Sequence, residues 1–541
     1  MHAYETHESP DDMLRAAPLD AAKRTRAEEI VVRLAQLSRA FVENLAAATA
    51  GWTKHVPDEA ALEGMPGRAR RRARLHAQAQ QQDGFLLTLD APSYADAVQH
   101  LADRKLRHDV YEAYVTRASD HGPRALHFDN TPLVHETLAL RHELALLLGF
   151  ENYAELALRH GVLRTPDDVE HYLLRNGAEA RARAQAELDT IWAFAKAKGA
   201  PKGFSTWDLG YYAMWLKREQ LGFDEDDLRA YFALPNVLAG LFALTERLLG
   251  VRVVAPTVAA RTGEVRTYTL IAHTGEELGH LALEPSTPAG PLEGAGVDVS
   301  YASGQPPLLR VRCDLEVLED GQPALLTHAA LRSLFRGVGA GLYLLLARLQ
   351  QADAPGLRYE HATASQIGGS YFELFTTHFD TLATLARHHA SGAVLPRELF
   401  DQLIRSRDFH AGLAAALELE LALFDLRVHR DYVPVGKATQ LRMHVLDTLA
   451  QVRREVCVLR PPFWERMANT CPALFAEGRA GRIWEISWAK QMAAEMFAQL
   501  EASGFAPATA RRLRDTFWVA GDRDLRKRLT DALGQTPKLL P

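Results

Sequence analysis

Cysteine is scarce in this chain of 541 residues, which contains only Cys313, Cys457 and Cys471. Three thiols spread this widely are too few for a disulfide framework or a four-thiolate metal site. Disulfides are also rare in reducing compartments, so the small number of cysteines fits an intracellular protein.

The chain also lacks long hydrophobic runs. Its first residues are polar and acidic and contain no apolar segment of the kind that a secretory signal requires. The most apolar stretch, residues 341–349, is interrupted by Arg348 and is too short to cross a bilayer. We therefore expect a cytoplasmic protein that does not use a membrane as a partner.

An excess of positive charge is absent as well. Lys and Arg number 62, Asp and Glu number 68, and the net charge is -6. Nucleic-acid binding depends on a basic surface that neutralises phosphates, so no nucleic-acid partner is expected. The short basic run over residues 66–82 is interpreted as the solvated face of a helix.

Helical periodicity dominates what is present. Apolar residues recur at helical spacing over residues 24–50, and Thr165 followed by Pro166 and two acids predicts a capped helix start. Strands are predicted over 251–258, 265–272, 278–284 and 308–316. The prediction is a mainly α protein with a polar tail over 1–23, helices over 24–250, a small sheet within 251–320 and helices over 321–541.

Familiar catalytic signatures are missing. The sequence contains no H-E-x-x-H, no P-loop, no Rossmann glycine fingerprint and no G-x-S-x-G. There are 22 histidines, but pairs such as His135 and His142 have a spacing that surface or core residues also show. The motifs alone therefore assign no chemistry.

Several longer segments resemble a known family. They begin at Phe128 (FDNTPLVHETLALRHELALLLGFENYAELAL), Trp207 (WDLGYYAMWLKRE), Leu228 (LRAYFALPNVLAGLFALTERLLG), Ala422 (ALFDLRVH) and Leu474 (LFAEGRAGRIWEISWAKQMAAEMF). They are similar to oligopeptidase A and, more distantly, thimet oligopeptidase, which are zinc metallopeptidases that cut short peptides in a deep channel. The resemblance implies a two-lobed helical fold over residues 24–541. An N-terminal helical part of one channel wall has no counterpart here.

The family's zinc ligands are not matched. In that family both histidines of H-E-x-x-H and a later glutamate hold the zinc, and the glutamate of the motif is the general base. Aligning the corresponding segments places Arg336 and Ala340 at the two histidine positions, Gly337 at the base and Ala362 at the third ligand. The resemblance therefore implies a vacated zinc site, and no cofactor is expected.

The substrate-orienting loop of the family is also altered here. Its tyrosine-type positions correspond to Arg479, Ile483, Trp484 and Ile486, so none of the phenols remains. Arg482 lies in the same loop. A zinc set rebuilt from Glu360, His361 and Glu373 is disfavoured, because nothing on the helix of Arg336 would complete it.

Arg336 brings a permanent positive charge to the vacated position. A guanidinium there suits a carboxylate or phosphate, or it pairs with Glu373 or Glu360 and only fills the space. Three glycines within one and a half helical turns predict close approach by another segment or a ligand. The candidate ligand-binding residues are Arg336, Arg479, Arg482, Gly337, Gly339 and Gln366.

Two functions remain open from the sequence. The first is a pseudo-peptidase that binds a peptide or small peptide-like, anionic ligand without cutting it, alone or with a protein partner. The second is a metal-free enzyme of transferase, cyclase or ligase type acting on a peptidic metabolite, with Glu373, His361 and Tyr371 as candidate catalytic groups and Cys313 as an outside nucleophile. An active zinc oligopeptidase is disfavoured, because H-E-x-x-H is absent.

Overall fold

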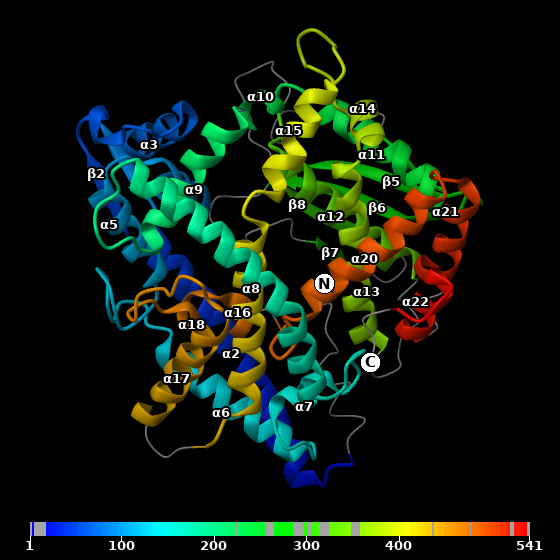
Figure 1. Cartoon of the computed structure of the whole chain (residues 1–541). Helices are drawn as coiled ribbons and strands as arrows, with labels where there is room; N and C mark the ends of the chain where they lie inside the picture. The colour runs from blue at the N-terminus through cyan, green and yellow to red at the C-terminus, as the bar shows by residue number, and fades with distance from the viewer. Residues whose placement is uncertain are drawn as a thin grey trace.

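The structure is a computed structural model. It describes residues 3–4, 18–222, 225–255, 265–285, 297–300, 306–313, 324–347, 357–434, 438–476, 478–519 and 524–537. Within these residues the chain is mainly helical with two small sheets, which confirms the predicted fold class (Figure 1).

The helices follow the periodic segments of the sequence. In chain order they are α2 (Ala21–Ala50), α3 (Gly67–Ala79), α4 (Ala91–His100), α5 (Arg104–Val115), α6 (Thr131–Leu147), α7 (Tyr153–Leu158), α8 (Pro166–Ala197), α9 (Thr206–Leu221), α10 (Glu225–Arg229), α11 (Leu234–Leu249), α12 (His328–Leu346), α13 (Leu357–Leu374), α14 (Phe379–Leu385), α15 (Arg397–Asp408), α16 (Ala411–Arg430), α17 (Ala438–Val456), α18 (Met467–Thr470), α19 (Pro472–Phe475), α20 (Glu485–Ala502), α21 (Pro507–Leu513) and α22 (Leu525–Leu533). Two short 3-10 turns, η1 (Glu59–Leu62) and η3 (Phe375–Thr377), and a π-helical turn, η4 (Arg514–Trp518), complete the set in the described part.

The predicted start of α8 is confirmed. The side chain of Thr165 accepts a hydrogen bond from the backbone N–H of Asp168, which satisfies one of the amides left open at a helix start. The helix ends just before Gly199, whose φ of 78° is in the left-handed region that glycine adopts without strain.

The main sheet has six strands in the order β1-β7-β8-β6-β5-β4. Its strands are β4 (Val251–Val254), β5 (Arg266–Ala272), β6 (Glu277–Pro285), β7 (Val297–Ser300), β8 (Leu308–Cys313) and β1 (Ala3–Tyr4). All neighbours are antiparallel except β6 and β8, which are parallel. The sheet lies where the sequence predicts it, and the parts of the predicted strands over 256–258 and 314–316 fall outside the described residues. Residues 3–4, within the predicted polar tail, form the edge strand β1.

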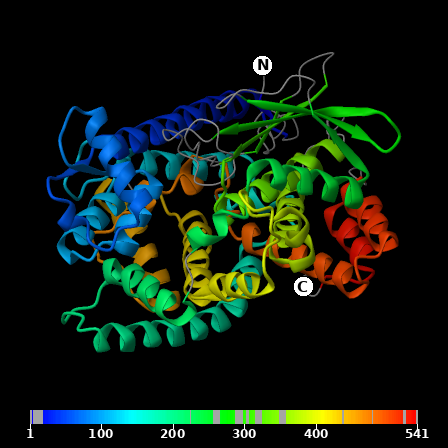
Figure 2. The ribbon, with the colours of Figure 1, turned by 90° about the horizontal axis from the view of Figure 1, so that it is seen from above.

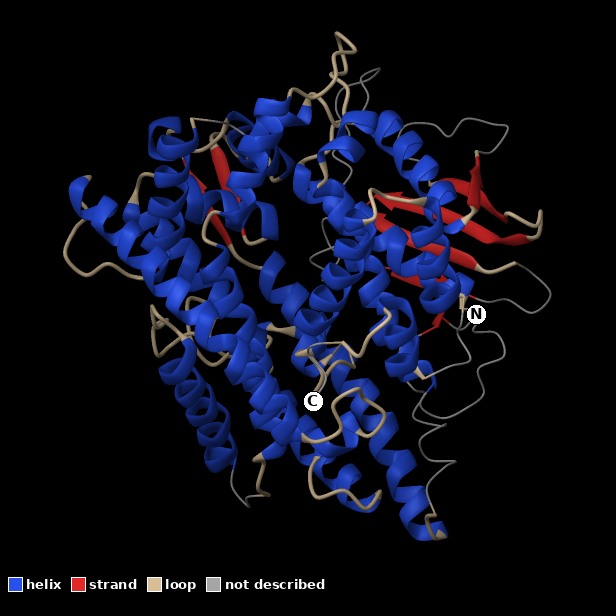
Figure 3. Ribbon diagram, turned by 45° about the vertical axis from the view of Figure 1, so that its right-hand side comes forward, coloured by secondary structure: helices blue, strands red, loops and turns tan. Residues whose placement is uncertain are grey.

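A second, two-stranded sheet was not predicted. It pairs β2 (Thr53–Val56) with β3 (Phe85–Thr88) in antiparallel register, and its strands are separated by α3. Its apolar residues pack with those of α3, α4 and α5 in a separate hydrophobic cluster. The two sheets lie in opposite halves of the molecule (Figure 3).

The helix α12 lies between the main sheet and α13. A Cβ on Gly341 would be 2.2 Å from Leu309 of β8, and a Cβ on Gly339 would be 2.7 Å from the carbonyl oxygen of Gly368 on α13. The prediction that these glycines permit close approach is thus confirmed for Gly339 and Gly341, while Gly337 is buried. Figure 2 shows the sheet lying across this helical half of the molecule.

The same helix is the one described segment that is long and apolar enough to cross a membrane. However, 67% of its apolar window is buried inside the fold. Leu331, Leu334 and Phe335 are wholly enclosed. Packing against the sheet and α13 therefore accounts for its composition.

Candidate functional site

The site begins where α12 crosses α13. Arg336 and Ala340, one helical turn apart, both meet α13 at Gly369. A Cβ on Gly369 would be 2.8 Å from the carbonyl oxygen of Arg336 and 3.3 Å from the Cβ of Ala340. The two positions that correspond to the family's histidines thus face the same segment of α13.

Glu373 of α13 binds two arginines of α12. Arg336 donates from Nε to Oε2 at 2.6 Å, and Arg332 donates from Nε to Oε1 at 2.8 Å. The sequence left two roles open for Arg336, binding an anionic ligand or pairing with an internal acid. The structure shows the pairing with Glu373. Arg332 was missed by sequence reasoning, although its position one turn before Arg336 places it on the same helix face.

The charges of this cluster do not cancel. Burial disfavours the ionised form of Glu373, but the guanidiniums of Arg336 and Arg332 outweigh that effect and hold the pKa of this carboxyl below its ordinary value. The Glu373 side chain is 12% exposed, whereas those of Arg332 and Arg336 are 40% and 41% exposed. One carboxylate shared by two partly exposed arginines leaves a local excess of one positive charge.

The residues at the corresponding positions do not fit a zinc ion. Ala340 and Ala362 carry no donor atom, and the guanidinium of Arg336 is a permanent cation that cannot ligate a metal. The rebuilt set also fails, because its members have other partners: Glu373 binds the two arginines, His361 shares a hydrogen bond with the hydroxyl of Tyr343 at 2.8 Å, and Glu360 accepts one from an amide of α22. No cluster of three His, Cys, Asp or Glu with metal-binding geometry occurs among the described residues.

Two candidate catalytic groups are enclosed in the core. His361 is 1% exposed and Tyr371 is 2% exposed. The ring of Tyr371 packs against Phe375 with centroids 5.4 Å apart, and burial raises the pKa of its hydroxyl. Cys313 ends β8, and its side chain lies outside the described residues. Glu373, by contrast, adjoins two partly exposed charged groups, Arg332 and Arg336.

The loop over residues 478–484 is held by Asp425 of α16. Its two carboxylate oxygens accept hydrogen bonds from the backbone N–H groups of Gly481 at 2.8 Å and Ile483 at 3.0 Å. Ile483 and Trp484, at two of the tyrosine-type positions, are buried. The loop is thus packed into the core at these positions.

The predicted ligand-binding residues near this loop differ in their surroundings. Arg482 is buried and donates to Glu485 at 2.9 Å and to the hydroxyl of Thr363 at 3.2 Å, so its guanidinium is engaged within the protein. Arg479 is partly buried, as is Gln366 on α13. Since Thr363 is next to Ala362, Arg482 reaches the segment of α13 that the sequence alignment matches to the family's third ligand.

A buried polar network supports the other side of Asp425. His429 lies one turn along α16, and its Nδ1 is 3.3 Å from the Asp425 carboxylate. Arg141 donates to Nε2 of His429 at 2.9 Å and to the carbonyl of Leu474 at 2.8 Å. Burial lowers the pKa of His429, and the donation from Arg141 requires an unprotonated Nε2, so the imidazole is neutral with its proton on Nδ1.

Comparison with solved structures defines the class of fold. The chain is similar to "PZ peptidase A with inhibitor 2", with a TM-score of 0.55 and 10% identity, over 96% of this chain and 74% of that one. This is the helical fold of the oligopeptidases, with α12 and α13 crossing at the site. Residues 97–539 match peptidase family M3, and the chain belongs to that family.

Curated relatives are similar along most of the chain. Oligopeptidase A of Salmonella typhimurium is 34% identical over 520 residues, which cover 94% of this chain and 76% of that protein. The "Probable cytosolic oligopeptidase A" of Arabidopsis thaliana is 29% identical over 540 residues, covering 94% and 75%. The resemblance to oligopeptidase A is therefore confirmed at the level of the family.

Proposed function

We propose that this protein binds a peptide or small peptide-like, anionic ligand and does not hydrolyse it by a zinc mechanism. The observation that carries the proposal is the Arg332–Glu373–Arg336 cluster at the crossing of α12 and α13. It supplies excess positive charge where the family alignment expects a metal, and its one carboxylate is already engaged by both arginines. A carboxylate is the group that a partly exposed guanidinium binds best.

The buried surroundings favour this proposal over a repurposed enzyme. His361 and Tyr371 are enclosed, so the groups that would supply acid–base chemistry do not face a ligand. Relatives named as oligopeptidases indicate that a scaffold of this kind accommodates peptides. We expect the protein in the cytoplasm, in keeping with the name of the Arabidopsis relative.

Arg336→Ala should weaken binding of an acidic peptide, and Glu373→Gln should strengthen it. A suitable probe is a hexapeptide of alternating Ala and Glu with an acetylated N-terminus and an amidated C-terminus, so that only its side chains are charged. We expect Arg336→Ala to cost ~1.5–3 kcal/mol of binding free energy, the range for a hydrogen bond to a charged group. Glu373→Gln removes the carboxylate that competes with the ligand for both arginines.

Isothermal titration calorimetry measures both effects. Arg181→Ala is the matched control, because Arg181 is an exposed arginine of α8. Its affinity for the probe should equal that of the wild type. Equal affinity in the wild type, Arg336→Ala and Glu373→Gln would show that the cluster only fills space and would remove the basis of the proposal.

A further inference from the structure

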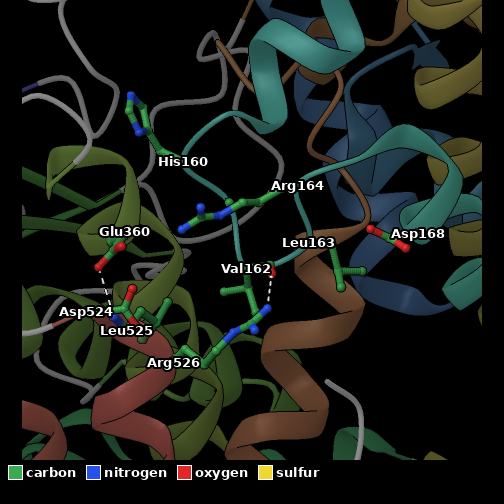
Figure 4. Close-up of a pocket in the computed structure, with 10 residues that line it drawn as sticks. His160, Val162, Leu163, Arg164, Asp168, Glu360, Asp524, Leu525 and Arg526 are labelled. Atoms are coloured by element: carbon green, nitrogen blue, oxygen red, sulfur yellow. Dashed lines mark hydrogen bonds between the residues drawn. The ribbon is translucent and has the colours of Figure 1, made fainter. Parts of the chain in front are cut away.

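A cavity lies away from the Arg332–Glu373–Arg336 cluster. It has a volume of 410 Å³, within the common range for small-molecule sites. Three segments line it: the connection from α7 to α8, the first turn of α13 and the start of α22 (Figure 4). The charged groups around it include His160, Arg164, Glu360, Asp524 and Arg526.

One wall of this cavity carries two carboxylates, and Arg526 beside them donates to the carbonyl oxygen of Val162 at 2.8 Å. Glu360 accepts a hydrogen bond from the backbone N–H of Leu525 at 2.9 Å, and Asp524 accepts one from the N–H of Lys527 at 3.1 Å. Each of these bonds uses one oxygen of its carboxylate. Burial, together with the nearby charge of Asp524, raises the pKa of Glu360, and the charges of Arg528 and Arg164 offset this only in part.

The arginine behind this wall pairs with it only at long range. Arg528 is fully buried, and its Nη2 lies 3.9 Å from Oε2 of Glu360, which is too long for a hydrogen bond. Its Nε and Nη2 have no hydrogen-bond partner in the described part of the chain. Buried polar atoms without partners are rare in folded proteins, so the region around Glu360 has unused hydrogen-bonding capacity.

The opposite wall is basic. Figure 4 shows Arg164 extending from the α7–α8 connection into the space between His160 and Glu360. Within the described residues its guanidinium makes no hydrogen bond. Burial and the charges of Arg159, Arg164 and Arg482 lower the pKa of His160 to about 4, so this imidazole is neutral at pH 7 and adds no charge to the wall.

Opposite charges on two walls select the ligand. Arg164 would attract a simple anion, but Glu360 and Asp524 would repel it. A simple cation would be attracted by the two carboxylates and repelled by Arg164. A molecule with a carboxylate at one end and an ammonium at the other would satisfy both walls at once. The volume is sufficient for such a molecule of two or three amino acids.

We propose that this cavity binds a short zwitterionic peptide, with its ammonium at Glu360 and Asp524 and its carboxylate at Arg164. The site is distinct from the Arg336 cluster. Glu360 and Glu373 are both on α13 and are separated by 13 residues, which corresponds to about 20 Å along a helix. A tripeptide in this cavity would therefore leave Arg336 free.

End-group specificity tests this assignment. The probes are trialanine, N-acetyl-trialanine and trialanine amide, each titrated calorimetrically into the wild type, Glu360→Gln and Arg164→Gln. Blocking either end should weaken binding to the wild type by about tenfold or more, since each end loses a charge-assisted interaction. Glu360→Gln retains an acceptor for the Leu525 amide, but it should bind trialanine and its N-acetyl form with similar affinity. Arg164→Gln should likewise bind trialanine and its amide with similar affinity.

Two exposed residues of α8 supply matched controls. Glu179→Gln and Arg181→Gln make the same chemical changes far from the cavity and should keep the wild-type preference for free ends. The Arg336→Ala variant should also keep the preference for free ends, but it should lose affinity for the blocked acidic hexapeptide. The assignment is overturned if trialanine fails to bind at millimolar concentration, if its blocked forms bind as tightly, or if both cavity variants retain the preference. None of these results would alter the outcome for the hexapeptide, so the two proposals fail separately.

Discussion

Asp425→Ala is expected to lower the free energy of unfolding by about 3–5 kcal/mol. Asp425 is 1% exposed and accepts hydrogen bonds from the backbone N–H groups of Gly481 and Ile483. Alanine would leave two buried amides without partners. It would also remove the negative charge that favours the cationic form of the buried Arg141.

Urea unfolding followed by tryptophan fluorescence measures this loss. Asp425→Asn should have an intermediate effect, because the amide oxygen can still accept one of the two backbone hydrogen bonds. Asp401→Ala is the matched control: Asp401 is 45% exposed and pairs with Arg397 on the surface of α15. That change should cost about 0.5 kcal/mol or less. If Asp425→Ala lowered the free energy of unfolding no more than the control does, the Asp425 carboxylate would not be the group that holds the loop over residues 478–484.

Asp208→Ala is expected to have a comparable effect, about 3–5 kcal/mol, at the start of α9. Asp208 is 1% exposed and binds the guanidiniums of Arg104 at 2.7 Å and Arg107 at 3.1 Å. It also accepts a hydrogen bond from the backbone N–H of Ser205 in a capping box. Alanine would leave Arg107, itself 1% exposed, as a buried cation without its carboxylate.

Asp109→Ala provides the comparison for this site. Asp109 also carries two cationic partners, but these are Lys54 and Lys105, and all three side chains are partly exposed. Its replacement should cost about 1 kcal/mol or less. Urea unfolding of both variants measures the two losses. If Asp208→Ala and Asp109→Ala lowered the free energy of unfolding by similar amounts, burial would not explain the larger effect expected at Asp208.

These two aspartates explain part of the family resemblance. Asp208 lies in the segment beginning at Trp207, and Asp425 lies in the segment beginning at Ala422. In the structure the first caps a helix and binds two arginines, and the second holds a loop. Both segments therefore preserve the scaffold, and their similarity to oligopeptidase A carries no information on whether the metal site is active.

Local signals in the sequence were sufficient for the helices and the main sheet. The start of α8 could be predicted because a capping threonine, a proline and two acids act within one turn. The β2–β3 pair could not, because its two short strands lie 28 residues apart and their pairing depends on tertiary packing. The strands β1 and β7 pair across a much longer stretch of chain, and no local pattern in the sequence indicated that pairing either.

The contacts of the candidate site could not be predicted from the sequence. The alignment identified Arg336, Ala340 and Ala362, and the structure places the first two against α13. The choice of partner for Arg336 between Glu373 and Glu360 depended on the register of α13 against α12, which the sequence does not determine. The cavity near Arg164 was missed because its walls come from segments about 200 and 360 residues apart, which no motif connects.

We expect that this member of peptidase family M3 does not use zinc to cut peptides. The direct measurement is hydrolysis of internally quenched oligopeptides by the purified full-length chain, with one equivalent of zinc and with a chelator. The Salmonella typhimurium oligopeptidase A, assayed in parallel, is the positive control. We expect no cleavage by this chain in either condition, because Arg336, Ala340 and Ala362 supply no ligand for the metal. Cleavage that requires zinc and stops on chelation would contradict it.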